Sequence, residues 1–267
     1  GHGRLEVTFL DVGQGDAIFI QTPQGQRFLL DGGGANFTGT YNAGERVVVP
    51  YLIRRGIFTL DGVFNSHPDG DHLDGLLPVL EIIKVKKVFT PPLDYFGDQY
   101  QQFMELTRLK EIDHLQLTAG DKIRLDGGPV VLEVLHPPPI FEPGSTGNNN
   151  SLVFRLSFGS VQFLFTGDLE VEGMEKLLAS ARPLNSTILK IPHHGSGDGY
   201  DVDFYQAVSP KAVVISVGKN NFGHPAPEII DYWYGQGVSI YRTDWDGAVT
   251  FLTDGKGLQV QTMGREF

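Results

Sequence analysis

The feature that most constrains the fold is a group of two histidines and two aspartates in residues 66–72, Ser-His-Pro-Asp-Gly-Asp-His. The group follows an apolar stretch that predicts a buried strand, 63–65, and precedes the helical leucine spacing of 73–83. Pro, Asp and Gly also form solvated turns, but a turn does not need paired histidines. We expect His67, Asp69 and Asp71 to converge on one side while His72, at the helix start, points elsewhere. The segment therefore predicts a metal-binding loop able to serve two adjacent cations.

Three further apolar strands end in residues of the same kind. Residues 163–165 lead to Asp168, residues 188–191 lead to His193 and His194, and a strand ending near 217 precedes His224. Alone, Asp168 could cap a helix, and a lone histidine is weak evidence. Together, four such strand ends predict one shared site. Mixed imidazole and carboxylate ligands suit Zn²⁺, Mn²⁺ or Fe, and two ions about 3.5–4 Å apart fit the number of ligands.

Composition excludes several classes of protein. The chain has 267 residues, a net charge of −11 and no cysteine, so disulfides, thiolate metal sites and cysteine nucleophiles are excluded. The acidic balance argues against non-specific nucleic-acid binding through a broad basic surface. No apolar run approaches the ~18 residues of a membrane span, and no signal peptide is recognisable, so we expect no direct membrane insertion. Gly1 and His2 resemble a cloning scar, and residues 3–267 are expected to form a single domain.

Strands and helices alternate in both halves of the chain. Helical spacing is expected at 47–55, 73–83, 99–110, 174–181 and 227–235, and antiparallel strands at 115–135. A hairpin is expected from 5–10 and 17–21, joined through two glycines. Residues 145–150 belong to a long loop of the kind that is often functional. The arrangement predicts an α/β fold of two packed sheets with helices outside.

These motifs resemble the metallo-β-lactamase superfamily, whose hallmark after a strand is H-x-H-x-D-H. Asp69 stands where that family has its second histidine. The resemblance implies an αββα sandwich of two mixed β-sheets flanked by helices. It also implies that Asp168 bridges two metals, that His224 is the last histidine ligand, and that Asp31 supports a ligand from the end of an early strand.

A narrower resemblance is carried by residues 9–17 (Phe-Leu-Asp-Val-Gly-Gln-Gly-Asp-Ala), 148–153, 192–196 and 223–225. As a combination, these motifs are similar to the C-terminal domain of the ComEC family, the bacterial DNA-uptake channel proteins of natural competence. That resemblance implies an extracytoplasmic domain of a bacterial membrane protein. It implies a nuclease that degrades the non-transported strand during transformation, with single-stranded DNA and the membrane channel of the same full-length protein as partners. Phosphorylcholine esterases share part of the set.

The family's usual third histidine is not obvious here, because residues 148–150 occupy its place and only His114 and His136 lie nearby. We therefore expect His193 to supply the missing imidazole. Asp69 in place of histidine favours Mn²⁺ over Zn²⁺. One ion is assigned to His67, Asp69, His193 and Asp168, and the other to Asp71, His72, Asp168 and His224.

Several residues are candidates for contact with the reacting phosphodiester, and Asp71 counts among them as well as among the ligands. His194 and Lys190 could contact the transition state or leaving group, or could instead support a ligand and form a salt bridge. Asn149 and Asn150 could donate hydrogen bonds to a phosphoryl oxygen, although a polar turn explains them slightly better. Asp16, on the glycine-rich turn, is expected to hold the loop or a ligand histidine.

Aromatic and basic residues leave the substrate open. Tyr95, Phe96 and Tyr100 could stack on bases, although a lid or core role explains them equally well, and residues 232–234 are expected to pack. A DNA-cleaving nuclease competes with a non-catalytic DNA-guiding domain and with another metallohydrolase such as a phosphorylcholine esterase. A basic groove leading to the metals would favour the nuclease; its candidate residues are Arg54, Arg55, Lys84, Lys86, Lys87, Lys190, Lys211 and Lys219.

Overall fold

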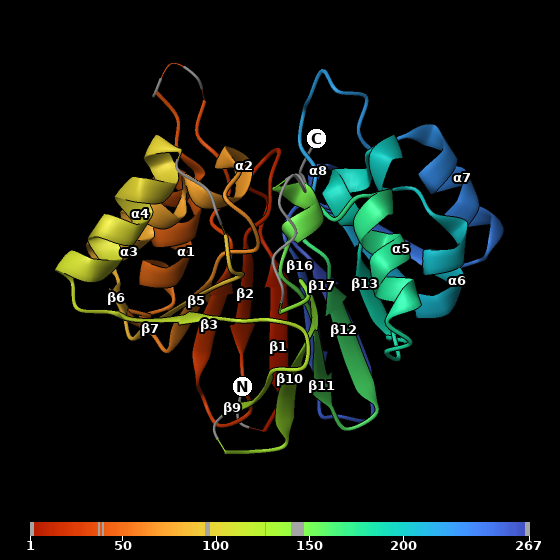
Figure 1. Cartoon of the computed structure of the whole chain (residues 1–267), viewed down its shortest axis with the longest axis horizontal. Coiled ribbons are helices and arrows are strands. Elements are labelled where there is room, and N and C mark those ends of the chain that lie inside the picture. Colours follow the sequence, from red (N-terminus) through yellow and green to blue (C-terminus); the bar gives the residue numbers. More distant parts are fainter. Residues whose placement is uncertain are drawn as a thin grey trace.

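The computed structural model describes residues 3–36, 38, 40–93, 97–125, 127–139 and 147–264. Two mixed sheets pack face to face, and helices cover the outer face of each (Figure 1). The predicted αββα sandwich is therefore confirmed. Gly1, His2, Tyr95 and Phe96 lie outside the described residues.

The first sheet has eight strands in the order β17-β16-β1-β2-β3-β5-β7-β8. Strands β3, β5, β7 and β8 run parallel to one another, and the remaining neighbours are antiparallel. The antiparallel pair β1 and β2 is the predicted hairpin. The bounds are β1 Leu5–Phe9, β2 Ile18–Gln21, β3 Arg27–Leu30, β5 Gly62–Phe64, β7 Lys87–Thr90, β8 Asp113–Gln116, β16 Val249–Thr253 and β17 Leu258–Thr262.

The second sheet has seven strands in the order β15-β14-β13-β12-β11-β10-β9, and its strands β12 to β15 run parallel. A separate two-stranded sheet pairs β4 with β6. The bounds are β4 Thr59–Leu60, β6 Lys84–Val85, β9 Lys122–Leu125, β10 Val130–His136, β11 Val153–Phe158, β12 Val161–Phe165, β13 Ile188–Lys190, β14 Ala212–Ile215 and β15 Ser239–Arg242.

Helices flank the two sheets on opposite sides of the molecule (Figure 1). A π-helical turn, Gly44–Val48, leads into α1 Val49–Arg54, so the helix predicted at 47–55 begins with wider winding. The leucine pattern predicted as one helix is split by Gly75 into two, α2 and α3. The remaining bounds are α2 Gly70–Leu73, α3 Leu76–Ile82, α4 Asp98–Leu109, α5 Val171–Ala179, α6 Val202–Val208, α7 Pro227–Gly235 and α8 Thr243–Asp246.

Three apolar layers hold the sandwich together. Phenylalanines from both sheets fill the space between them, including Phe64, whose ring stacks on Phe89 at 4.5 Å between ring centres. A second layer lies under the helices of the first half and contains Tyr100, so the core role is the one observed for this residue. The third layer contains Trp233, whereas its neighbour Tyr234 is 82% exposed because adjacent helical residues face different directions.

The carboxyl ends of parallel strands from both sheets deliver the polar residues predicted from the sequence. Asp31 follows β3, residues 65–67 follow β5, Asp168 lies three residues past β12, and His194 lies just past β13. The sheets thus place four chain segments around one point, near α2 at the upper end of the molecule in Figure 1. Among the described residues, no helix combines the length and apolarity needed to cross a membrane.

Candidate metal centre

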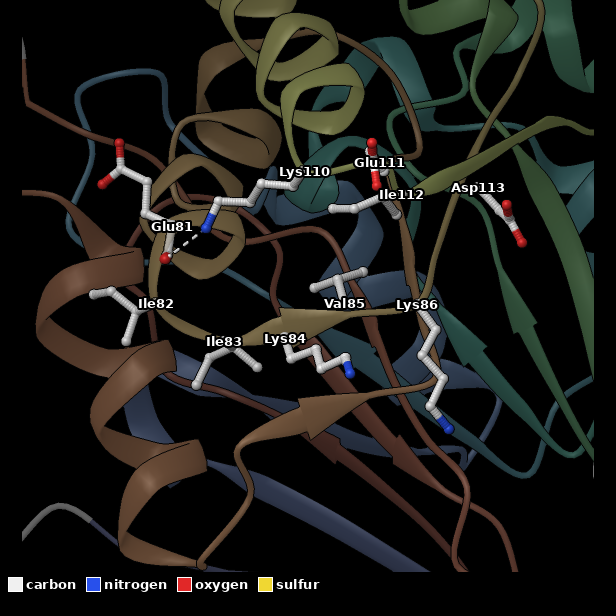
Figure 2. A pocket seen from close by; sticks show the side chains of 10 residues that line it. All are labelled: Glu81, Ile82, Ile83, Lys84, Val85, Lys86, Lys110, Glu111, Ile112 and Asp113. Carbon is white, nitrogen blue, oxygen red and sulfur yellow. Dashed lines mark hydrogen bonds between the residues drawn. The ribbon is translucent and has the colours of Figure 1, made fainter.

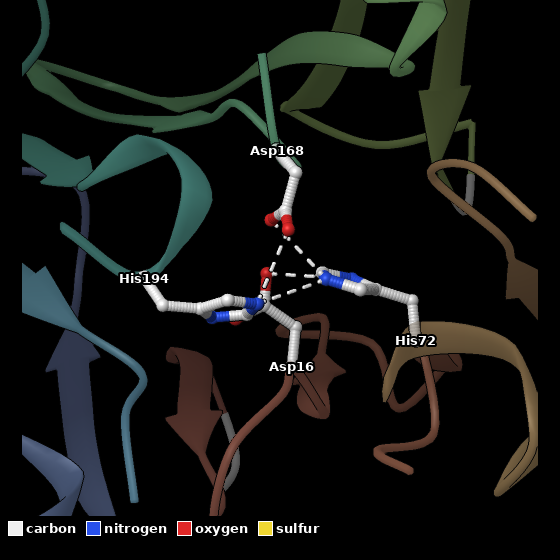
Figure 3. A group of neighbouring side chains, drawn as sticks. All are labelled: Asp16, His72, Asp168 and His194. Atoms are coloured by element: carbon white, nitrogen blue, oxygen red, sulfur yellow. Dashed lines mark hydrogen bonds and ion pairs between the residues drawn. The ribbon is translucent and has the colours of Figure 1, made fainter. Parts of the chain in front are cut away.

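Four buried side chains meet where the two sheets come together: Asp16, His72, Asp168 and His194 (Figure 3). Each offers a nitrogen or oxygen ligand atom, and these atoms all lie within 4.8 Å of one another. Asp16 comes from the loop between β1 and β2, and His72 comes from α2. Because the four residues come from segments far apart in the sequence, the cluster exists only in the folded chain.

Asp168 stands at the centre of this cluster and receives imidazoles on both carboxylate oxygens. Its Oδ1 lies 3.1 Å from His72 Nε2, and its Oδ2 lies 3.2 Å from His194 Nε2. The Nε2 atoms of His67 and His193 are each 3.9 Å from Oδ2. A carboxylate with donors facing both oxygens has the arrangement needed to bridge two cations.

The loop 67–72 contributes to both sides of Asp168. His67 Nε2 lies 3.8 Å from Asp69 Oδ2, while Asp71 Oδ2 lies 3.2 Å from His194 Nε2. The expectation that His72 and His67 point to different sides holds at Asp168, whose Oδ1 faces His72 and whose Oδ2 faces His67, although the two ring centres are 4.2 Å apart. The Asp69 and Asp71 side chains are 48% and 35% exposed, so the cluster opens to solvent on their side.

The outer nitrogen of each buried histidine is already engaged. Nδ1 of His67 lies 2.9 Å from Ser66 Oγ, Nδ1 of His72 lies 2.9 Å from Asp31 Oδ2, and Nδ1 of His194 lies 2.9 Å from the Ser216 carbonyl oxygen. Such partners orient metal-binding imidazoles and leave Nε2 for the ion. His67 Nε2 is buried without a hydrogen-bond partner among the described residues. An unsatisfied buried nitrogen in a mixed imidazole and carboxylate set fits a divalent metal.

Asp31 holds this arrangement from behind. Its carboxylate accepts hydrogen bonds from the Ser66 backbone N–H at 2.7 Å and the Ser66 hydroxyl at 2.6 Å, in addition to the contact with His72. Its φ of 58° lies in the left-handed region, which Asn and Asp tolerate better than most residues. The placement agrees with the supporting role that the family resemblance implies.

We predict that Asp31→Asn weakens divalent-metal affinity by roughly 10- to 100-fold, the usual effect of losing a partner of a ligand histidine. Asparagine keeps the size and tolerates the backbone conformation, but it removes the negative charge facing His72. Titration calorimetry with Mn²⁺ or Zn²⁺ measures the effect. Asp203→Asn, an exposed change on α6, should leave the affinity unchanged. Equal affinities for the Asp31 variant and the parent protein would contradict the supporting role.

Lys190 lies beneath the cluster and is 1% exposed. Its Nζ lies 2.6 Å from Asp16 Oδ2, 2.8 Å from the Gly167 carbonyl oxygen and 3.5 Å from Asp168 Oδ1. Burial opposes the charged form, but Asp16 and Asp168 outweigh it and raise the pKa of Lys190. Of the two roles that the sequence allowed for Lys190, the structure therefore has the salt bridge. Its partner, Asp16, is thus paired with a cation that the protein itself supplies.

Charge in the cluster is strongly negative before any ion is added. Five carboxylates gather around it against the single lysine, namely Asp16, Asp31, Asp69, Asp71 and Asp168. Although burial opposes protonation, Asp168 raises the pKa of His72 well above its usual range and that of His194 to about 10. Protons therefore occupy the metal-free cluster. Once metal displaces these protons, Lys190 leaves four of the five negative charges, which two divalent cations would cancel.

The three later histidines lie at different depths. His194 is 1% exposed, whereas the His193 side chain is 20% exposed, and both adopt positive φ angles of 53° and 48°. Non-glycine residues in this region are strained and concentrate at functional sites. His224 lies further out: its ring packs on His193 at 5.7 Å, and its Nδ1 is 3.5 Å from Gln14 Nε2.

Asn149 and Asn150 are buried beside the cluster. Asn149 Oδ1 accepts hydrogen bonds from the Gly173 N–H at 3.0 Å and the Glu170 N–H at 3.3 Å, and its Nδ2 donates to Glu170 at 3.1 Å. These bonds tie the loop to the start of α5. His136, also considered above, lies 2.8 Å from the Asn149 carbonyl oxygen through its Nε2. The side-chain amide of Asn149 thus has a structural role, because it joins the loop to α5.

The basic residues predicted to line a groove are divided among separate cavities. Lys84, Lys86 and Lys110 line one of about 610 Å³ between the ends of α3 and α4, where Glu81, Glu111 and Asp113 balance their charge (Figure 2). Arg54 and Arg55 line another of about 460 Å³. Neither cavity includes a residue of the metal cluster. Neither cavity is therefore the basic groove leading to the metals that would favour a nuclease.

Known proteins resemble this chain along nearly its whole length. ComE operon protein 3 of Bacillus subtilis (strain 168) is 30% identical over 257 residues, 92% of this chain and 33% of that protein. Competence protein ComA of Neisseria gonorrhoeae is 30% identical over 259 residues, 96% of this chain and 33% of that protein. The chain spans about a third of the length of these curated relatives, and the predicted resemblance to competence proteins is confirmed.

Solved structures share the fold at low sequence identity. YhfI of Bacillus subtilis, a metallo-β-lactamase fold protein, has a TM-score of 0.58 and 13% identity, covering 93% of this chain and all of its own. Igni18, a metallo hydrolase of Ignicoccus hospitalis, has a TM-score of 0.57 and 14% identity, covering 92% and 98%. The sequence model of the metallo-beta-lactamase superfamily matches residues 10–219 of this chain. With its two-sheet sandwich and its ligand-bearing loop at 67–72, this chain belongs to the metallo-β-lactamase superfamily.

Proposed function

We propose that this domain is a metal-dependent phosphodiesterase that cleaves single-stranded DNA with two divalent ions, Mn²⁺ or Zn²⁺. In a bacterial membrane protein, it would act outside the membrane and degrade the strand that is not transported. The observation that carries the proposal is Asp168, a buried carboxylate with imidazole nitrogens facing both of its oxygens.

The geometry supports a division of ligands around Asp168. His67 and His193 approach Oδ2 of Asp168, and Asp69 lies 3.8 Å from His67, which supports the first set that the sequence suggested. His72 approaches Oδ1, and His194 Nε2, which also lies 3.2 Å from Oδ2, is 3.2 Å from both His72 Nε2 and Asp71 Oδ2. We therefore assign His194 to the second ion in place of His224. When bound, such a pair of ions activates water and offsets charge on a phosphodiester.

The remaining residues of the chain prepare the site for an anionic substrate. Lys190 pairs with Asp16, which limits the repulsion among the buried carboxylates. Asp69 and Asp71 face the open side, so a phosphate has to approach there. His224 lies beside His193 at the rim of that opening, where its imidazole N–H can donate to a phosphoryl oxygen or protonate a leaving oxygen.

DNA is supported as the substrate by the names of the relatives, and the charge of the chain restricts where DNA can be bound. Similar proteins are named for competence, and one from Haemophilus influenzae is named Recombination protein 2, at 28% identity. With a net charge of −11, the domain has no overall electrostatic attraction for DNA. Affinity must therefore come from the metal centre and its immediate surroundings.

The proposal is tested by adding Mn²⁺, Zn²⁺ or Mg²⁺ singly to metal-stripped protein with an end-labelled single-stranded oligonucleotide. Cleavage that depends on Mn²⁺ or Zn²⁺ and is lost in His72→Ala is the expected result. A p-nitrophenyl ester of phosphorylcholine provides the competing substrate. Hydrolysis of that ester without cleavage of DNA would overturn the choice of substrate. Tight metal binding without hydrolysis of either would overturn the enzymatic role.

A further inference from the structure

An exposed aromatic ring stands close to the metal centre on the loop between β14 and α7, the blue loop that rises at the top of Figure 1. Phe222 on this loop is 74% exposed. Its ring lies 5.6 Å from the His224 ring, and His224 lies 5.7 Å from His193. Three rings thus form a row from the edge of the metal cluster to solvent.

The loop that carries Phe222 is held in place by the side chain of Asn220. Its amide Nδ2 donates to the carbonyl oxygens of Gly218 and His224 at 2.9 and 2.8 Å. Its Oδ1 accepts from the N–H groups of Phe222 and His224 at 3.0 and 3.1 Å. One buttressed turn therefore fixes the backbone on both sides of the exposed ring.

The base of the loop rests on the turn that carries the Val-Gly-Gln-Gly motif. A Cβ on Gly218 would lie 2.4 Å from the backbone of Gly13, so the two segments are in direct contact. The Gly218 N–H donates to Gln14 Oε1 at 3.4 Å, and Gln14 Nε2 lies 3.5 Å from His224. The motif next to Asp16 thus also positions the loop that presents Phe222.

We propose that Phe222 is a nucleobase-stacking residue that holds the base beside the phosphodiester at the metal centre. One side of its ring packs towards His224 and the rest faces solvent, which leaves room for a flat partner. Aromatic rings stack on every base, so the contact would favour single-stranded substrates without selecting a sequence. A preorganised ring costs little entropy on binding. This inference rests on the proposed cleavage of DNA.

The test compares a single-stranded oligonucleotide with one of equal length whose sugars carry no bases. For Phe222→Ala, we expect KM for the base-bearing strand to rise roughly fivefold or more, which is the usual effect of losing one stacked base. We expect kcat to change by less than about twofold, because the metal ligands are untouched. Phe222→Trp should retain the parent KM. Tyr234→Ala, which removes an equally exposed ring from α7, is the matched control.

A binding arm separates this inference from the proposed function. Anisotropy of fluorescein-labelled phosphorothioate strands, which resist cleavage, measures affinity in Mn²⁺ with the metal centre loaded. Weaker binding of the base-bearing strand by Phe222→Ala alone supports stacking even if no metal restores cleavage. A Phe222→Ala variant that cleaves and binds both strands as the parent does would overturn stacking while leaving the nuclease intact. Equal loss on the abasic strand would also overturn it, since no base is then involved.

Discussion

Asp168→Asn is expected to lower the rate of DNA cleavage by roughly a thousandfold or more, which corresponds to about 4 kcal/mol of transition-state stabilisation. Asparagine has nearly the same size, but only one of its two terminal atoms can bind a cation. Because His72 faces one oxygen of Asp168 while His67 and His193 face the other, the change affects both proposed ions. Single-turnover cleavage of an end-labelled strand at saturating metal measures the effect.

Two further measurements show whether the loss of cleavage comes from the metal site and not from unfolding. Circular dichroism should show that the variant is folded, and metal analysis after gel filtration should show a loss of bound ions. Asp203→Asn, on the exposed surface of α6, should retain both cleavage and metal. If Asp168→Asn cleaved DNA at the parent rate, Asp168 would have no part in the chemistry, and the assignment of a bridging carboxylate would be wrong.

Lys190→Met is expected to destabilise the metal-free domain by roughly 3–5 kcal/mol, because it leaves the buried Asp16 carboxylate without its cation. Methionine fills much of the same space and adds no charge. Chemical unfolding in EDTA, followed by circular dichroism, measures the free energy of unfolding. Lys86→Met provides the contrast, because its ion pair with Asp61 is at the surface and should contribute less than about 1 kcal/mol.

A double variant shows whether the loss comes from the broken pair. Asp16→Asn combined with Lys190→Met removes both charges, so its free energy of unfolding should recover much of the loss seen for Lys190→Met alone. The effects of two substitutions on the free energy of unfolding are expected to be non-additive when the two residues interact. Strict additivity of the two single effects would show that Asp16 and Lys190 contribute independently, which would contradict the pairing described here.

The strand ends could be predicted because their signal is local. Apolar runs followed directly by His or Asp place those residues at the carboxyl edge of a sheet, and parallel strands bring such edges together. Asp31, His67 and Asp168 therefore lie where the sequence placed them, around one centre. Strand β17 and helix α6 were not predicted. Strand β17 alternates apolar and polar residues but has only two apolar residues, Leu258 and Val260, and α6 is short.

The depth of individual side chains could not be predicted in the same way. Adjacent His193 and His194 look alike in sequence, and only their left-handed backbone decides which ring faces Asp71 and His72. Burial of Lys190 depends on its pairing with Asp16, a residue far away in the sequence. Asn149 gave no signal for its contacts with α5, because hydrogen bonds to backbone N–H groups have no sequence pattern beyond the residue type.

The measurement that most directly tests the central claim is anomalous X-ray diffraction from crystals of the domain grown with Mn²⁺. The account predicts two anomalous peaks about 3.5–4 Å apart, one on each side of the Asp168 carboxylate. His67 would border one peak and His72 the other, because they face different oxygens of Asp168. A single peak, or peaks away from Asp168, would contradict the two-ion centre on which the proposed cleavage of DNA depends.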